Sequence, residues 1–172
     1  YRGELFAFPQ RAFAELRPGV TLHYGPHLRA ICRQLERVLA GEIPRLMILM
    51  PPRHLKSHCA SVAFPVWALG RDPSRRVICI SYGADLAAGF ARDARRLIEA
   101  PFARATFPGL ALDPRRASVE ELRTTRNGAR IVTSVNGALT GRGGDVLILD
   151  DPMKAEDAAS QFALEKPGYI YS

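Results

Sequence analysis

The sequence lacks the features of a membrane, secreted or repeat protein. None of its apolar runs approaches the roughly 20 residues that a membrane-spanning helix needs. The chain opens YRGELFAFPQ, without a basic stretch followed by an apolar core, so we expect no signal peptide. It also has no internal repeat and no low-complexity tract. These absences favour a globular cytoplasmic protein, and a length of 172 residues fits about one domain.

Cysteine is scarce and odd in number. Cys32, Cys59 and Cys79 form no CxxC motif and no Cys/His cluster with the spacing of a zinc site. Free cysteine is among the residue types most often buried. We therefore expect buried, reduced thiols, as in a cytoplasmic protein.

Negative charge is in the minority. The chain has 24 Lys and Arg against 17 Asp and Glu, a formal net charge of +7, and most of the basic residues are arginine. The arginine side chain presents a planar fork that matches phosphate, so the excess fits a polyanionic partner, either a nucleotide or DNA. An arginine-rich composition also arises simply from a GC-rich genome.

Apolar spacing predicts helices alternating with strands. Helical spacing marks 28–39, which Gly41 ends, and 84–100, where most charged residues fall opposite the apolar side. Short apolar runs predict strands at 46–50, 75–82, 129–135 and 145–150. Residues 101–114 read as a loop, and residues 1–22 as a leader without a clean period. This alternation favours an α/β fold with a mainly parallel sheet flanked by helices.

The stretch 51–57, PPRHLKS, has the composition of a phosphate-binding loop. It follows the predicted strand 46–50, whose unbroken apolar run indicates burial on both faces, as in a parallel sheet. Such a loop needs backbone N–H groups, a lysine for the β- and γ-phosphates and a hydroxyl for Mg²⁺. Lys56 and Ser57 supply the last two at the start of a helix expected over 56–69, whose macrodipole would favour an anion.

The same stretch departs from the strict pattern GxxxxGKS. Glycine would stand at the positions of Met50 and Leu55, and Leu55 occupies a place where backbone normally approaches the ligand. Arg53 adds a second cation within reach of the phosphates. The alternative is a strand, a Pro-Pro turn and a helix that begins with Lys-Ser by chance. In either case Pro65 is expected to bend or end the helix.

A second chemical element lies at the end of the predicted strand 145–150. This strand delivers Asp150 and Asp151 to its carboxyl end, and ligands of doubly wound sheets bind at that edge. Phosphoryl transfer needs a metal-held carboxylate and a positioned nucleophile. Asp150 is therefore expected to hold Mg²⁺, and Asp151 to orient and deprotonate the attacking water. The alternative is a helix-capping pair before Pro152.

Three segments together resemble the large subunit of phage terminases, the motors that package double-stranded DNA into procapsids. The segment HLRAICRQLERVLAGEIPRLMILMPPRHLKS is similar to the family's N-terminal helix, strand and Walker A stretch, whose usual form is PPRHGKS. The segment ISYGADLAAGFARDARRLIEAPFARATFP is similar to the next strand, helix and loop. The segment VNGALTGRGGDVLILDDPMKAEDA is similar to the Gly-rich turn and Walker B strand. Together they cover roughly Tyr24–Asp157, in the family's order.

The resemblance implies a P-loop NTPase of the ASCE or RecA-like architecture, an ATP hydrolase that uses ATP and Mg²⁺. The implied phosphate-binding residues are Arg53, His54, Leu55, Lys56 and Ser57. The implied metal ligands are Ser57 and Asp150, and Asp151 would be catalytic.

Three further residues take roles from the resemblance. Arg142 lies in the turn before the Walker B strand, a region where the family can carry an arginine finger. The alternative is an arginine that binds the sheet edge or DNA. Tyr24 and His27 lie where the family often packs the adenine, and packing between helices is the alternative.

The resemblance also divides the chain into a leader at 1–22, an ATPase domain at 23–164 and a divergent tail at 165–172. In the related ATPase fold one further strand lies between those carrying Walker A and Walker B, and the family continues to a nuclease domain. The ending QFALEKPGYIYS no longer resembles the family. We therefore expect an incomplete domain with unpaired strand edges, from a truncated or frameshifted product without nuclease activity.

The implied function is the ATPase that powers packaging of bacteriophage DNA, in the bacterial cytoplasm and docked on the procapsid portal. The implied partners are double-stranded DNA, the portal, the small terminase subunit and further copies in a homo-oligomeric ring, with no membrane. Two alternatives stay open. One is a helicase-like translocating ATPase of the same superfamily, and the other an inactive prophage remnant that binds nucleotide or DNA without turnover.

Overall fold

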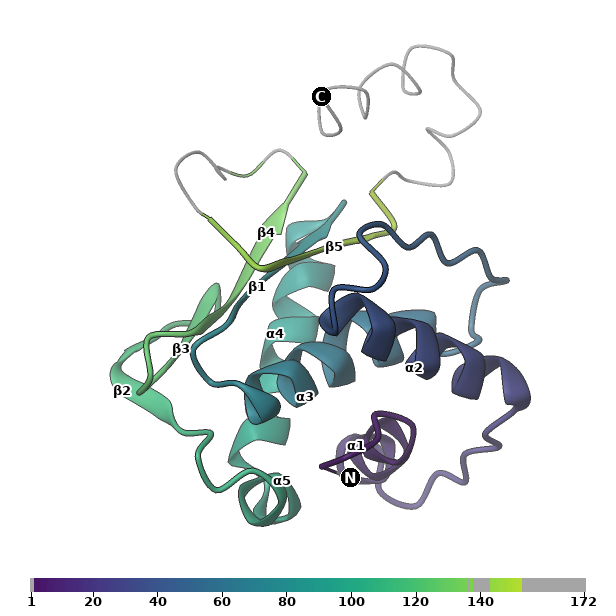
Figure 1. Ribbon diagram of the computed structural model, residues 1–172, viewed down its shortest axis with the longest axis horizontal. Helices are drawn as coiled ribbons and strands as arrows, with labels where there is room; N and C mark the ends of the chain where they lie inside the picture. Colours follow the sequence, from purple (N-terminus) through teal and green to yellow (C-terminus); the bar gives the residue numbers. More distant parts are fainter. Residues whose placement is uncertain (1, 136, 138–142, 153–172) are drawn as a thin grey trace.

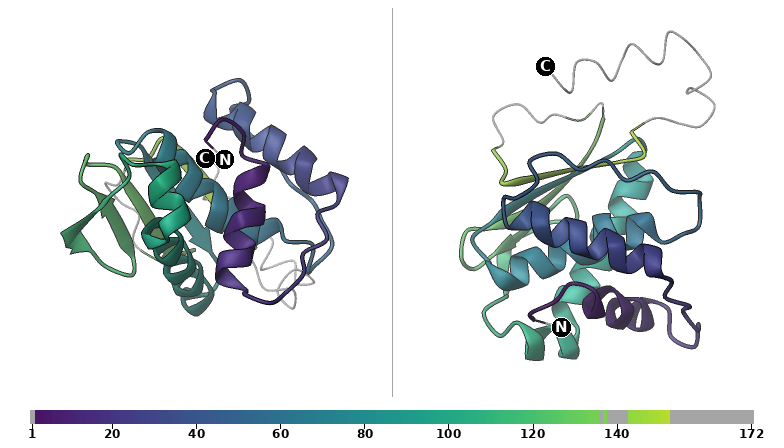
Figure 2. Two further views of the ribbon diagram at one scale, coloured as in Figure 1. Left: turned by 90° about the horizontal axis from the view of Figure 1, so that it is seen from below. Right: turned by 45° about the vertical axis from the view of Figure 1, so that its right-hand side comes forward.

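A computed structural model describes residues 2–135, 137 and 143–152, and these residues form an α/β fold. The helices are α1 (Ala7–Leu16), α2 (Pro26–Leu39), the π-helix η1 (His58–Ala63), α3 (Phe64–Arg71), α4 (Ala84–Glu99) and α5 (Pro101–Thr106). The strands are β1 (Arg76–Ser81), β2 (Leu112–Ala117), β3 (Glu121–Thr124), β4 (Ala129–Ser134) and β5 (Val146–Asp150). Figures 1 and 2 show the helices gathered on one side of the sheet. The α/β class predicted from the sequence is confirmed.

The sheet is mixed, with the strand order β2-β3-β4-β1-β5. Strand β1 pairs in parallel with β4 and β5, whereas β3 pairs antiparallel with β2 and β4. The sheet is therefore mixed: its β4-β1-β5 part is parallel, as predicted, and its β2-β3-β4 part is antiparallel. The two antiparallel pairs involve β2 and β3, which the apolar pattern did not predict because charged residues interrupt both strands: Asp113, Arg115 and Arg116 in β2, and Glu121 and Arg123 in β3. The loop prediction also fails at 101–106, which form α5.

The segment 46–50 was predicted as a strand buried on both faces, and this prediction is wrong. No strand is assigned there, and the segment pairs with none of the described strands. Its burial alternates: Leu46, Ile48 and Met50 pack against the core, whereas the side chains of Met47 and Leu49 are 80% and 85% exposed. A continuous apolar run shows that both faces of a segment are hydrophobic. The outer face becomes buried only if another part of the chain packs against it. The described sheet ends at β5, and none of its strands pairs with 46–50.

One long helix forms the centre of the core. It begins at Lys56 and runs through η1 and α3 to Arg71, and residues 59–70 are all buried. Helices α1, α2 and α4 and strand β5 all contact η1. Pro65 does not end this helix, because the chain widens into π-helical turns directly before it. The segment expected as a leader contains α1, whose Phe8, Ala12 and Leu16 are buried in the same core.

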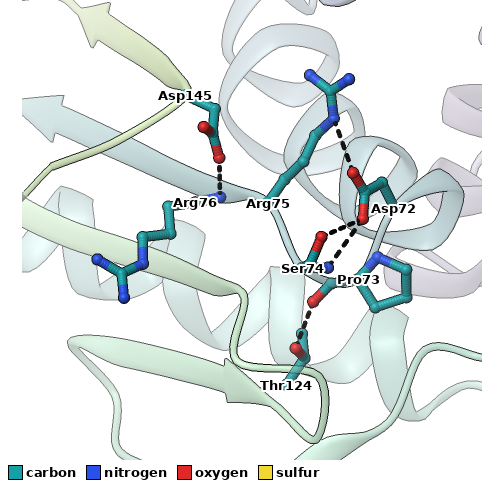
Figure 3. Close-up of polar contacts among 7 residues, drawn as sticks. All are labelled: Asp72, Pro73, Ser74, Arg75, Arg76, Thr124 and Asp145. Carbon is teal, nitrogen blue, oxygen red and sulfur yellow. Dashed lines mark hydrogen bonds and ion pairs between the residues drawn. The ribbon is translucent and has the colours of Figure 1, made fainter.

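Polar contacts fix the edge of the sheet at which β1 and β5 begin (Figure 3). The carboxylate of Asp72 accepts hydrogen bonds from the backbone N–H and the hydroxyl of Ser74, and the hydroxyl of Thr124 donates to the carbonyl of Pro73. Asp145 accepts from the backbone N–H of Arg76 at 2.7 Å. These contacts join the α3–β1 turn to the β3–β4 hairpin and to the start of β5. The carboxyl ends of β1 and β5 lie at the opposite edge, where the candidate site is found.

Candidate functional site

The loop before η1 and the end of β5 meet at one charged contact. The Nζ atom of Lys56 lies 3.2 Å from Oδ1 of Asp150 and also forms an ion pair with Oδ1 of Asp151. Lys56 and Asp151 are 95 positions apart in the sequence. In Figure 1 the yellow-green end of β5 lies beside the blue stretch that leads into the long helix. The fold thus brings together the predicted lysine and the predicted acidic pair at the carboxyl edge of the parallel strands.

The parallel register sets the position of the acidic pair. Asp150 is aligned with Ser81, the last residue of β1, and Ser81 is aligned with Ser134, the last residue of β4. The three strands therefore end together at one edge. Asp151 follows immediately, with a φ of +47°, and its carbonyl accepts a hydrogen bond from the N–H of Tyr82 at 3.2 Å. Ligands of open α/β sheets bind beyond this edge.

The two carboxylates have different environments. Asp150 is 4% exposed, and its Oδ2 accepts a hydrogen bond of 2.7 Å from the hydroxyl of Ser61, while its Oδ1 faces Lys56. Asp151 is 59% exposed, and its described side-chain contact is the ion pair with Lys56. A buried and anchored carboxylate suits metal binding, and an accessible one suits contact with solvent. The two carboxylates thus differ in exposure and in their partners, and their division of roles stays a prediction.

The acidic pair also changes the titration of Lys56. Burial alone lowers the pKa of this amine, but its hydrogen bond to Asp151 and the charge of Asp150 outweigh burial, so the pKa is raised. Lys56 therefore stays an ammonium ion at neutral pH. A fixed positive charge at the start of a helix is the arrangement that favours a bound phosphate.

The backbone of the loop is held in an unusual conformation. Arg53 and Leu55 have φ angles of +64° and +62°, in the left-handed region that non-glycine residues seldom adopt. Such a conformation costs an L-residue on the order of 1–2 kcal/mol, whereas glycine adopts it freely. Leu55 is also the position at which the P-loop pattern carries glycine. The backbone at 55 thus has the conformation that glycine favours, although the residue is leucine.

The remaining predicted residues are placed unevenly. Arg53 is exposed on the loop, and Ser57 is half-buried in the first turn of the helix. The Nδ1 atom of His54 donates to the carbonyl of Pro52 at 2.8 Å, and its ring meets that of His27 edge-on at 5.9 Å. His27 thus lies against the loop. Arg142 lies outside the described residues.

Tyr24 belongs to the packing of the helices. Its ring meets Phe6 edge-on with centroids 5.2 Å apart, and its hydroxyl lies 3.6 Å from the Sγ atom of Cys59. Burial raises the pKa of this phenol, and the nearby Cys59 raises it further. The packing alternative accounts for these contacts. All three cysteines are free and buried, as predicted.

Two buried polar residues next to the site, Ser61 and Arg130, were not predicted from the sequence: Ser61 bonds Asp150, and Arg130 bonds Ser61. Ser61 lies in η1 and is 1% exposed, and Arg130 lies in β4 and is fully buried. The Nη2 atom of Arg130 donates to the carbonyl of Ser61 at 2.8 Å. Two signals in the sequence point to this arrangement: an arginine inside the apolar run of β4, and a proline four residues after a serine within a helix. π-Helical turns inside helices are frequent at functional sites.

The predicted metal ligands at this edge, Ser57 and Asp150, have oxygen donors, the atoms that hard cations prefer. No cluster of three or more His, Cys, Asp or Glu side chains with metal-site geometry occurs within the described ranges. Mg²⁺ usually takes one or two protein carboxylates and completes its shell with water and substrate phosphates. The hydroxyl of Ser57 and Oδ1 of Asp150 are oxygen donors of this kind.

No protein-family model and no curated protein matches the chain. Among the helices of residues 2–135 and 143–152, none is both long and apolar enough to cross a membrane.

Proposed function

We propose that this chain is the nucleotide-binding ATPase part of a phage terminase large subunit. The observation that carries the proposal is the contact of Lys56 with Asp150 and Asp151, which joins a loop of Walker A type to a strand end of Walker B type. The terminase-like segments quoted above support the assignment to a packaging motor. The proposal includes ATP with Mg²⁺ as ligands and double-stranded DNA as the polymer that is moved. It also includes the bacterial cytoplasm as the compartment, and the portal, the small subunit and a homo-oligomeric ring as assembly partners.

The charged contact defines what nucleotide binding must change. Lys56 is paired with two carboxylates, so a triphosphate that binds its ammonium group competes with them for its three N–H donors. Asp151 is the exposed partner, with Lys56 as its described side-chain contact, whereas Asp150 is also held by Ser61. Release of Asp151 would leave its carboxylate at the strand end, free to orient water. Lys56 thus acts both as the phosphate ligand and as the group that holds Asp151 in place until nucleotide arrives.

The charges of the site are matched to a magnesium–nucleotide complex. Ser57 and Asp150 would hold Mg²⁺, which when bound neutralises phosphate charge as the terminal phosphoryl group is transferred. Arg53, exposed on the same loop, adds a positive charge on the solvent side. With Lys56 it supplies the cations that a triphosphate requires. Leu55 places a side chain where the loop backbone would approach the phosphates.

A second candidate function is binding without turnover. Two observations favour it. Leu55 has a left-handed φ at the position where the P-loop pattern carries glycine, and Met47 and Leu49 expose apolar side chains on the segment that leads into the loop. Both depart from what an active phosphate-binding loop and its preceding buried strand are expected to show. A helicase-like translocating ATPase would share every feature described above. Neighbouring genes for a small terminase and a portal would separate packaging from that alternative.

Phosphate release separates an ATPase from a binding remnant. Turnover of Mg-ATP by the purified chain should exceed that of Lys56→Ala, which removes the phosphate ligand. It should be unaffected in Arg45→Ala, which removes an exposed cation just before the segment 46–50. Equal turnover in all three proteins would eliminate the ATPase and leave the binding remnant to be tested by nucleotide affinity.

A further inference from the structure

Ser61 lies where the central helix and β5 exchange polar contacts. Its hydroxyl donates to Oδ2 of Asp150 at 2.7 Å, and its carbonyl accepts from Nη2 of Arg130 at 2.8 Å. All three side chains are buried, with exposures of 1%, 4% and 0% for Ser61, Asp150 and Arg130. A single buried residue therefore links a strand-end carboxylate to a buried guanidinium group.

Pro65 explains why the carbonyl of Ser61 is available. In an α-helix this carbonyl would accept from the backbone N–H of the residue four positions later, which here is proline and has no N–H. The helix widens into the π-helical turns of η1 at this point. The guanidinium of Arg130 then supplies a donor from the neighbouring strand. The proline, the wide helical turn and the arginine together account for how the carbonyl of Ser61 finds a donor.

Arg130 has no carboxylate partner among the described ion pairs. Its Nε and Nη1 atoms are buried without a hydrogen-bond partner in the described part of the chain. A buried guanidinium with unmet donors is destabilising unless it serves another group. The guanidinium also acts on the nearby thiol of Cys79: burial and the charge of Asp150 raise the pKa of this thiol, whereas the charge of Arg130 lowers it. Asp150 is thus paired with Lys56 and is linked to Arg130 through Ser61.

The hydrogen bond from Ser61 gives the two oxygens of Asp150 different partners. Oδ2 is held by the hydroxyl from the helix side, so Oδ1 is the atom presented to Lys56 and the loop. Without that hydroxyl the carboxylate would rotate more freely about its terminal torsion, which has only broad preferences. The hydrogen bond therefore determines which oxygen a ligand in the loop meets.

We infer that Ser61 is a positioning residue for magnesium-dependent nucleotide binding and that Arg130 supports it in this role. The inference rests on the proposed function, because it names the residue that aims the metal-binding carboxylate of that site. Ser61 touches neither the nucleotide nor the metal; it acts through Asp150. Loss of the Ser61 hydroxyl should therefore lower nucleotide affinity in the presence of Mg²⁺. It should leave the affinity measured without Mg²⁺ unchanged.

The test compares nucleotide affinity in Mg²⁺ with affinity in EDTA, using ADP and a non-hydrolysable ATP analogue. Ser61→Ala should lower the ratio of the affinity in Mg²⁺ to the affinity in EDTA about tenfold. This is the change in affinity expected from the loss of one hydrogen bond to a charged group. Ser61→Cys, which has a similar shape and a weak donor, should lower it to an intermediate extent. In an Asp150→Asn background, Ser61→Ala should cause no further loss, because the two residues act as one unit.

Val62→Ala provides the matched control. Val62 is the next residue of η1 and is 2% exposed, so its truncation lowers stability without touching Asp150. It should lower the melting temperature and leave the affinity ratio at its wild-type value. Equal ratios in Ser61→Ala and wild type would overturn the inference while leaving the proposed function in place, and so would equal losses in Ser61→Ala and Val62→Ala. A wild-type chain that binds no nucleotide in either condition would overturn both.

Discussion

Lys56 and Asp151 form an ion pair between the first residue of a buried helix and the residue that follows an edge strand of the described sheet. The same ammonium reaches Asp150, whose other oxygen is held by Ser61. One lysine thus connects an exposed carboxylate with a buried one, and the buried one is anchored to the same helix. This closed arrangement positions the candidate site before any ligand is bound.

Replacement of Leu55 by glycine should strengthen nucleotide binding. Glycine relieves a left-handed φ that costs roughly 1–2 kcal/mol, and without a Cβ atom it lets the loop backbone approach a phosphate more closely. Leu55 also packs against the core, so the loss of that contact offsets most of the gain. We expect the free energy of unfolding to change by less than about 1 kcal/mol while the affinity for Mg-ATP rises.

Leu55→Ala is the control for this prediction. It loses much of the packing but keeps a Cβ atom at the positive φ, so it should lower stability and give no gain in affinity. Both quantities can be measured by denaturant unfolding and calorimetric titration. A Leu55→Gly variant that binds nucleotide no better than Leu55→Ala would contradict the strained-loop account.

Stability should fall in mild acid because of His58. Its Nε2 atom donates to the carbonyl of Pro9 at 2.9 Å, which joins η1 to α1. Burial lowers the pKa of His58, and neither the hydrogen bond to Pro9 nor the charge of Asp93 offsets this effect; Arg17 lowers the pKa further. A depressed folded-state pKa favours the neutral ring in the native state. The stability it contributes is therefore complete above the unfolded pKa of about 6.5 and is lost as the pH falls through the lower folded value.

The measurement is the melting temperature between pH 8 and pH 5, for wild type and for two histidine variants. His58→Gln should reduce the fall in melting temperature on the acid side of this range. His23→Gln, which changes an exposed ring, should leave that fall as in wild type. An identical fall in wild type and His58→Gln would mean that other groups cause the loss.

Replacement of Arg130 by methionine should leave the stability of the ligand-free protein nearly unchanged. The variant removes the donor to the carbonyl of Ser61, which costs about 1–3 kcal/mol. It also removes a buried charge with two unpartnered nitrogen atoms, for which apolar replacement can return about 1–4 kcal/mol. We expect a net change within about 1 kcal/mol in denaturant unfolding. A loss above about 3 kcal/mol would show that Arg130 is principally a structural residue.

The segment 46–50 should tolerate charge on one side only. Met47→Lys changes a side chain that is 80% exposed and should alter the free energy of unfolding by less than about 0.5 kcal/mol. Ile48→Lys places an ammonium against the core and should cost several kcal/mol. Similar losses in the two variants would indicate that both faces of the segment are buried, as the sequence alone predicted.

Periodicity predicted the parts of the fold whose burial is set locally. Helices α2 and α4 and strands β1, β4 and β5 lie where apolar spacing placed them. The hairpin of β3 and β4 was missed, although Asn127-Gly128 is a turn signal: Asn127 has a φ of +65°, and a Cβ atom at Gly128 would lie 2.2 Å from the carbonyl oxygen of Pro73. The segment 46–50 was misjudged because its second face depends on a neighbour that its own sequence does not specify.

The candidate site divides in the same way. Lys56, Asp150 and Asp151 could be named from spacing and order along the chain, because the chemistry of phosphate binding prescribes residue types at strand ends. Ser61 and Arg130 belong to no such pattern. Their roles arise from a proline that removes a donor and from a strand that passes close enough to replace it, and this relationship exists only in three dimensions.

The most direct test of the central claim is the melting temperature of the chain with and without Mg-ATP, for wild type, Lys56→Ala and Arg45→Ala. A ligand present at about 100 times its dissociation constant stabilises the native state by about 2.7 kcal/mol, which raises the melting temperature by several degrees. The account predicts this rise in wild type and in Arg45→Ala, and its absence in Lys56→Ala. A folded wild-type chain whose melting temperature does not respond to Mg-ATP, or a Lys56→Ala variant that responds as strongly as wild type, would contradict it.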